Sequence, residues 1–194
     1  MSEEKPPRER RKPKPATPER LRKAALYYID RYATPAGHLK TVLMRRVSRS
    51  ARLHDTDIRE GQAWIDTIVA DLVSRGLVDD AVFAQNKAIS LHRGGASRRK
   101  TSLTLKSKGV GSDDIESALR ALEDANANAE LAAARNYARR RRFGPWRNDA
   151  ERAGRRDRDM AAMARAGFGF QMAQRVIDAP DIDTLEREVS ESDY

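Results

Sequence analysis

The chain has 194 residues, of which 39% are hydrophobic and 35% are charged. It carries 38 Lys and Arg residues against 29 Asp and Glu residues, and the resulting net charge of +9 favours a polyanionic partner, either nucleic acid or an acidic protein face. The absence of cysteine excludes disulfides, thiolate metal sites and thiol catalysis, and no apolar run is long enough to span a bilayer. We therefore expect a cytoplasmic protein without a membrane partner, although a basic surface can also be merely solvated.

The chain begins with a segment that is not expected to fold. Residues 1–16 hold four of the eight prolines and a cluster of Arg and Lys, so they cannot bury enough apolar area to form a core. We expect a disordered basic arm, which either contacts nucleic acid or keeps the chain in solution.

From Thr17 onward, hydrophobic residues recur at helical spacing, and no strand-like alternation interrupts them. A Thr-Pro pair, which is a helix-start signal, stands at 17–18 and again at 34–35, and Asp55 or Asp57 can cap the next helix. The expected helices cover about residues 18–32, 35–47, 58–75, 80–93, 98–108, 113–122, 127–143, 149–166 and 172–177. The sequence therefore predicts an all-α chain of about nine helices.

Two parts of the chain repeat each other. LKSKGVGSDDIESAL aligns with MARAGFGFQMAQRVI at a shift of 58 residues, which places Gly109 on Gly167 and Val110 on Phe168. Neither Gly-x-Gly completes a phosphate-loop motif or follows a strand, so we interpret these glycines as residues that end helices. The repeat indicates a modular helical array, against the alternative of a chance similarity between amphipathic helices.

The repeat sets the expected organisation. The predicted divisions are a basic arm at 1–16, a divergent first repeat at 17–78, a second repeat at 79–125, a third at 126–180 and an acidic tail at 181–194. The acidic tail is expected to be a solvated end of the chain, which could also compete with nucleic acid for basic surfaces. The residues assigned structural roles as caps, turn glycines or core side chains are Asp79, Asp80, Phe83, Leu105, Gly109, Gly167 and Phe168.

Four segments resemble the RecX family of bacterial regulators of the RecA recombinase: GLVDDAVFAQNKA (76–88), GGASRRKTSLTLKSKGV (94–110), IESAL (115–119) and MARAGFGFQMAQRVI (163–177). The resemblance implies an elongated, curved array of three three-helix repeats. It further implies binding in the helical groove of the RecA–DNA filament across adjacent protomers, with restraint of ATP hydrolysis, strand exchange and co-protease activity. Thr101 and Ala166 depart from the family pattern, which usually has a branched apolar residue and a basic residue there.

An enzymatic function is not favoured. The histidines His38, His54 and His92 are scattered without metal-ligand spacing, so neither a metal nor another cofactor is expected. The Asp pairs at 79–80 and 113–114 stand where helices begin, and capping explains both. A metal-dependent nuclease would need carboxylates that converge on one cleft, which a sequence cannot show.

Two basic groups are the candidate binding residues. The first begins in the first turn of a helix, where the helix dipole opposes positive charge; the filament-binding candidates are Arg98, Arg99, Lys100, Lys106, Lys108 and, from the family's R-x-G-F turn, Arg165. The second lies in the arginine-rich stretch 135–158; the nucleic-acid candidates are Arg139, Arg140, Arg141, Arg142, Arg147, Arg155 and Arg156. Few aromatic residues stand between these arginines, so contacts with phosphates or carboxylates are favoured over base stacking.

Two hypotheses remain open at this stage. The first is a monomeric regulator that binds and inhibits the RecA filament, with secondary contacts to single- and double-stranded DNA. The second is a non-specific helical DNA-binding protein, whose affinity for bare DNA would fall steeply with salt.

Overall fold

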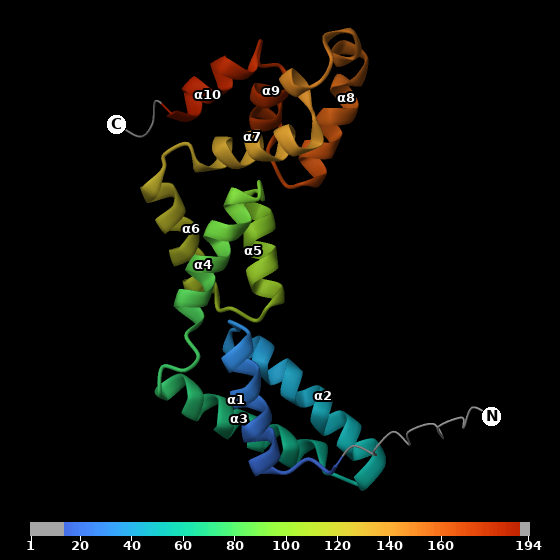
Figure 1. Cartoon of the computed structure of the whole chain (residues 1–194), viewed down its shortest axis with the longest axis vertical. Helices are drawn as coiled ribbons and strands as arrows, with labels where there is room; N and C mark the ends of the chain where they lie inside the picture. The colour runs from blue at the N-terminus through green and yellow to red at the C-terminus, as the bar shows by residue number, and fades with distance from the viewer. Residues whose placement is uncertain (1–13, 191–194) are drawn as a thin grey trace, which may run out of the picture. The chain divides into compact units, whose positions relative to one another are not determined.

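The computed structural model describes residues 14–190, which contain ten α-helices, one short 3₁₀ turn and no strand (Figure 1). This confirms the predicted all-α class. Most of the predicted basic arm and the last four residues of the predicted acidic tail lie outside the described residues. The chain divides into two compact units: unit 1 contains residues 14–34 and 38–78, and unit 2 contains 35–37 and 79–190.

Unit 1 contains α1 (Pro18–Arg31), α3 (Ile58–Ser74) and α2 (Ala36–His54) except for the first two residues of α2, which belong to unit 2. The Thr17 hydroxyl accepts a hydrogen bond from the backbone N–H of Arg20 and caps α1, as the Thr-Pro signal predicts. Apolar side chains from all three helices form the core; those with almost no exposure include Leu21, Leu39, Leu43, Val47, Ile65 and Leu72. The side chains of this core are aliphatic.

The turn between α2 and α3 settles which aspartate caps α3. Asp57 is the N-cap, and its carboxylate accepts hydrogen bonds from the N–H groups of Arg59 and Glu60. Asp55 instead adopts a left-handed conformation with φ +53°, which Asp tolerates better than most residues with a Cβ.

Unit 2 begins with a second set of three helices, α4 (Asp80–Arg93), α5 (Arg98–Ser107) and α6 (Ser112–Ala125). The Asp79 carboxylate caps α4 by accepting the N–H of Val82 at 2.9 Å, and Asp80 accepts the N–H of Ala36 at 2.8 Å. The core of this set consists of Ala84, Ala88, Leu105, Val110, Ile115, Ala118 and Leu119, with Phe83 partly buried against it.

A third set follows: α7 (Ala129–Arg141), the 3₁₀ turn η1 (Gly144–Trp146), α8 (Asp149–Arg165) and α9 (Phe170–Ile177). Its turn before α9 has the same backbone as the turn before α6. Gly109 and Gly167 have φ values of +78° and +94°, and the N–H groups of Val110 and Phe168 reach back to equivalent carbonyls at 3.3 and 3.2 Å. Gly111 and Gly169 are the N-caps, so the prediction that the Asp pair at 113–114 caps its helix was wrong; both aspartates lie in the first turn of α6 instead.

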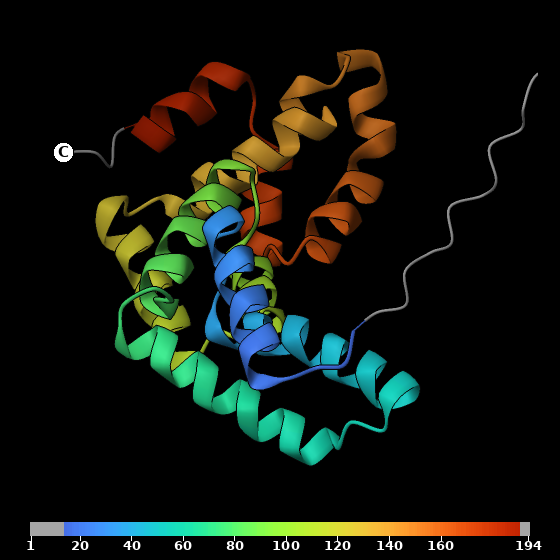
Figure 2. The same ribbon diagram turned by 60° about the horizontal axis from the view of Figure 1, so that its bottom comes forward.

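The acidic segment after Pro180 differs from the expected solvated end. Residues Ile182–Ser190 form α10, which packs against α7 (Figures 1 and 2). Leu185 and Val189, one turn apart on the same face, are buried in the core of the third set. The carboxylate of Glu186 pairs with Arg135 of α7. The prediction of a solvated end rested on charge alone and did not take the apolar pair Leu185 and Val189 into account.

Candidate interaction site in unit 2

The Gly-Gly-Ala-Ser segment (94–97) and the R-x-G-F turn (165–168) contact each other in the structure. Ser97, from the Gly-Gly-Ala-Ser segment, is fully buried and caps α5 by accepting the N–H of Lys100 at 3.1 Å. The same hydroxyl donates to the carbonyl of Ala166 at 2.8 Å, at the C-terminal end of α8. One side chain therefore starts α5 and ties it to a turn 69 residues further along the chain.

Two glycines make this close approach possible. Gly95 has a φ of +76°, and a Cβ there would lie 2.6 Å from the backbone nitrogen of Tyr137 in α7. Gly167 has a φ of +94°, and a Cβ there would lie 2.6 Å from the Ser97 hydroxyl. The conformation and the lack of space both require glycine, so the glycines of the two motifs hold the second and third sets of helices together.

A cleft of about 590 Å³ opens beside this joint, between the end of α4, the loop 94–96, α5, α7 and α8. Its cationic lining residues are Lys100, Arg140, Arg141 and Arg165. No Asp or Glu is among the described residues that line it, and none of the four cations forms an ion pair with any described residue. We call these four residues and their surroundings the basic cleft.

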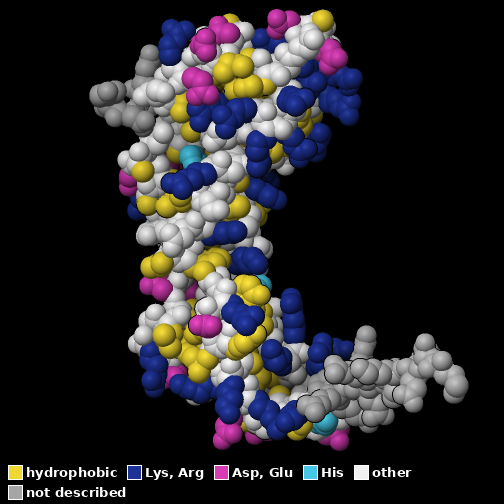
Figure 3. Space-filling view, in the orientation of Figure 1, with side chains coloured by type: hydrophobic (Ala, Val, Ile, Leu, Met, Phe, Trp, Pro, Cys, Tyr) yellow, Lys and Arg dark blue, Asp and Glu magenta, His cyan; other side chains and the backbone are white. Residues whose placement is uncertain are grey.

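The charge of the basic cleft determines what it can bind. Four cations without internal counterions attract carboxylates or phosphates, and the arginine forks can hold either of them through two parallel hydrogen bonds. The Arg141 guanidinium lies 5.8 Å from the centre of the Tyr137 ring, but Tyr137 and Phe143 are partly buried against the core. Figure 3 shows Lys and Arg side chains gathered over α5 and the end of α7.

The basic cleft combines residues from both predicted groups. Lys100 and Arg165 come from the filament-binding candidates, whereas Arg140 and Arg141 come from the nucleic-acid candidates. The other predicted cations do not line it; those that are exposed and form no ion pair with a described residue are Arg99, Lys106, Arg139, Arg142 and Arg155, and Lys108 is partly buried at the end of α5. Arg99 lies beside the Gly167 turn. Its Cβ is 3.4 Å from the position that a Cβ on Gly167 would occupy.

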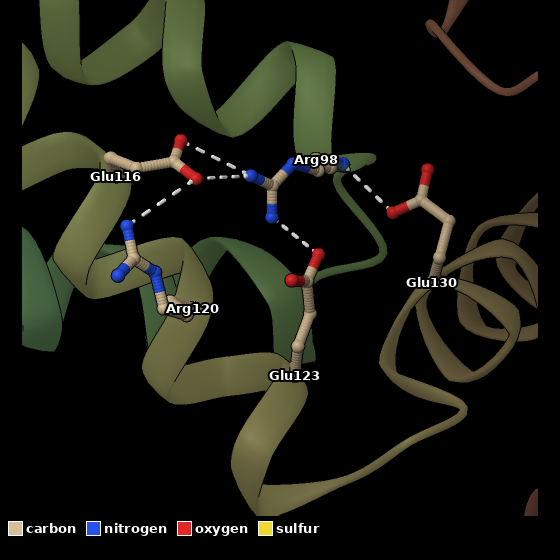
Figure 4. A network of polar contacts seen from close by, with 5 residues as sticks. All are labelled: Arg98, Glu116, Arg120, Glu123 and Glu130. Atoms are coloured by element: carbon tan, nitrogen blue, oxygen red, sulfur yellow. Dashed lines mark hydrogen bonds and ion pairs between the residues drawn. The ribbon is translucent and has the colours of Figure 1, made fainter.

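Arg98 is engaged inside unit 2 (Figure 4). Its guanidinium pairs with Glu116 at 3.1 Å and with Glu123, and its backbone N–H donates to the Glu130 carboxylate at 2.8 Å. Burial raises the pKa of Glu130, while the hydrogen bond from Arg98 opposes that shift. Arg98 therefore connects α5 to α6 and α7, which was not foreseen when it was grouped with the binding residues.

Arg147 and Arg156 also form internal pairs. Arg147 donates two hydrogen bonds to Asp159, at 3.0 and 2.8 Å, and the carboxylate side chain is only 3% exposed. Arg156 donates two to Asp178, at 2.7 and 2.6 Å, and this contact lowers the pKa of the Asp178 carboxyl. The structure gives both arginines partners within the protein, which weakens their case as nucleic-acid contacts.

Four arginines of α2 are absent from the predicted binding residues; these are Arg45, Arg46, Arg49 and Arg52. The signal that could have found them is composition, because the 19 residues of this helix include no Asp or Glu. Among residues 14–190, no helix is long and apolar enough to cross a membrane. Within the same range, His, Asp and Glu side chains form no group of three that could hold a metal ion.

Replacing Ser97 with alanine is expected to lower the free energy of unfolding of unit 2 by about 1–2 kcal/mol. The change removes an N-cap hydrogen bond and leaves the partly buried Ala166 carbonyl without its donor. Urea unfolding followed by Trp146 fluorescence, with Trp64 of unit 1 replaced by phenylalanine, measures it. Ser107→Ala is the matched control, since that exposed hydroxyl bonds only to a carbonyl of its own helix. Equal stability of the two variants would contradict the role assigned to Ser97.

These features define a class of protein: an all-α chain of repeated three-helix units with a basic cleft at the joint between two of them. Comparisons with known proteins give the family. Residues 79–119 match the family model described as RecX, second three-helix domain. No solved structure matches the chain at a significant level.

Three relatives are named Regulatory protein RecX. The relative from Myxococcus xanthus is 41% identical over 170 residues, which cover 87% of this chain and 90% of the relative. The relative from Agrobacterium fabrum is 29% identical over 80% of both chains, and that from Thermobifida fusca is 30% identical over 80% of this chain and 83% of its own. The chain therefore belongs to the RecX family of regulatory proteins. None of these names states a catalytic activity.

Proposed function

We propose that this protein regulates RecA by binding the RecA–DNA filament, in its helical groove and across adjacent protomers. In this position it lowers ATP hydrolysis, strand exchange and co-protease activity. Membership of the RecX family supports RecA as the partner. The observation that carries the proposal is the basic cleft, whose four cations have no counterion among the described residues.

The basic cleft is proposed to bind acidic side chains of RecA. Arg140 and Arg165 supply planar guanidinium forks, which suit carboxylates, and Lys100 adds a mobile point charge. Further contacts at the other sets of helices add to this one through effective concentration, so several weak contacts give stable binding to a filament.

The test is RecA's ATPase rate on single-stranded DNA, titrated with the full chain at less than one copy per RecA. Wild type is expected to suppress the rate in salt at which the protein does not bind bare DNA. Arg140→Gln with Arg165→Gln is expected to need about tenfold more protein, a loss of roughly 1.4 kcal/mol. The control, Arg155→Gln with Arg158→Gln, makes the same change in net charge on the exposed face of α8 and is expected to act like wild type.

Two outcomes would contradict the proposal. If suppression occurs only when the protein coats the DNA, competition for DNA explains it, and the non-specific DNA-binding function takes its place. If the control variant loses as much activity as the cleft variant, general charge rather than the basic cleft is responsible.

A further inference from the structure

Unit 1 carries a row of arginines that the proposed contact with RecA does not use. Arg45, Arg49 and Arg52 recur along one side of α2, and Arg46 stands next to the first of them. All four are exposed, and none forms an ion pair with a described residue. By contrast, Lys40 at the start of the same helix pairs with Asp66 at 2.6 Å. We call the four arginines the α2 ridge.

A hollow lies on each side of the α2 ridge. One, of about 570 Å³, is formed with the beginning of α1 and adds Lys14 and Arg20. The other, of about 610 Å³, is formed with α3 and adds the side chains of Ser48 and Gln62. Arg45 and Arg49 line both hollows, and no carboxylate is among the described lining residues of either. In Figure 3, Lys and Arg side chains lie over α2.

The α2 ridge stands on a fixed support. The opposite face of α2 buries Leu39, Leu43 and Val47 completely. Near the C-terminal end of the helix, the buried Ser50 hydroxyl accepts the N–H of Ala16 at 2.7 Å and hydrogen-bonds with the Thr56 hydroxyl at 2.6 Å. The arginine stems therefore project from a helix whose position within unit 1 is set by its core.

The dimensions and chemistry of the α2 ridge fit a nucleic-acid backbone. Arg45 and Arg52 are seven residues apart, so they are about 10 Å apart along the axis of α2, a distance over which a duplex rises by about three base pairs. Arg, Lys, Ser and Gln side chains are the usual donors to phosphate oxygens. No aromatic side chain is among the described residues that line either hollow, so these residues offer no stacking platform of the kind by which proteins hold single-stranded bases.

We propose that the α2 ridge binds the phosphate backbone of double-stranded DNA without reading its sequence. This binding requires no RecA, so it goes beyond the proposed regulatory function and does not depend on it. The two surfaces then have different partners: the basic cleft of unit 2 binds protein carboxylates, and the α2 ridge of unit 1 binds duplex phosphates.

The experiment measures fluorescence anisotropy of a short labelled DNA duplex with the full chain, over a series of salt concentrations and without RecA. Arg45→Gln with Arg49→Gln is expected to weaken binding at least tenfold. It should also lower the slope of log affinity against log salt by about 1.8, because two phosphate contacts are lost. The matched control is Lys23→Gln with Arg158→Gln, two exposed cations without ion pairs among described residues, and it should change binding less than threefold.

A second variant distinguishes lost contacts from lost folding. Arg45→Lys with Arg49→Lys keeps the charge and is expected to retain most of the affinity, since a phosphate accepts a lysine as a point charge. Equal weakening in the Gln variant and the control would overturn the proposal. Tighter binding of the full chain to single strands than to the duplex would also overturn it. The same holds if the Gln variant no longer binds a labelled polyglutamate peptide but still binds the duplex like wild type, because the α2 ridge would then have another partner.

Discussion

Replacing Arg147 with methionine is expected to lower the free energy of unfolding of unit 2 by about 3–5 kcal/mol. Arg147 is the bidentate partner of Asp159, and the side chain of this carboxylate is only 3% exposed. Methionine keeps much of the volume of the arginine side chain but leaves the Asp159 carboxylate buried without a counterion. Removing one partner of a buried ion pair costs far more stability than replacing both partners with apolar residues. Urea unfolding measures the loss.

The measurement must report on unit 2 alone, since two units can unfold in separate transitions. Trp146 lies next to Arg147 in unit 2, whereas Trp64 belongs to α3 of unit 1. A Trp64→Phe background therefore confines the fluorescence signal to unit 2.

The matched control for this prediction is Arg155→Met, which removes an exposed arginine without an ion pair among described residues. It is expected to change the free energy of unfolding by no more than about 0.5 kcal/mol. If Arg147→Met were equally mild and instead weakened DNA binding, Arg147 would be a nucleic-acid contact after all, as its place in the arginine-rich stretch predicts.

Arg147 also shows where reasoning from the sequence reaches its limit. It was grouped with its neighbours because charge density is visible in a sequence, but the pairing of each charge is a tertiary property. Asp159 lies twelve residues further on, and only the packing of α8 against η1 brings the two together. The same holds for Arg98, whose partners come from α6 and α7.

The helix caps and turn glycines could be predicted from the sequence because their interactions span only a few residues. Thr17, Asp79 and Ser97 each accept an N–H from three residues further along the chain, and a sequence shows that spacing directly. Gly109 and Gly167 could be recognised for the same reason, since a helix that ends in a left-handed residue favours glycine.

The first repeat was recognised only as divergent because it builds the same kind of turn from different residues. Asp55 occupies a left-handed position like that of Gly109, and Asp57 occupies an N-cap position like that of Gly111. The basic cleft could not be predicted from the sequence for another reason. Its lining residues run from Ser90 to Ala166 in the chain, and the sequence placed its cations in two separate groups.

Replacing Gly95 with alanine is expected to lower the free energy of unfolding of unit 2 by about 2–5 kcal/mol. The left-handed conformation accounts for about 1–2 kcal/mol, because φ is +76°. The rest, about 1–3 kcal/mol, comes from overpacking, since the new Cβ would lie 2.6 Å from the Tyr137 backbone nitrogen, which cannot rotate away. Trp146 fluorescence in the Trp64→Phe background again measures the loss.

Two further glycines separate these contributions. Gly76 has a φ of +68° with no atom within 4 Å of a new Cβ, so Gly76→Ala should cost unit 1 only the conformational part, followed through Trp64. Gly154 lies in α8 with open space around it and an ordinary φ, so Gly154→Ala should raise the free energy of unfolding by about 0.5–1 kcal/mol. If Gly95→Ala costs no more than Gly76→Ala, α7 does not rest on the Gly-Gly turn. The basic cleft, whose walls depend on that contact, would then lack the fixed geometry on which the proposed binding of RecA is built.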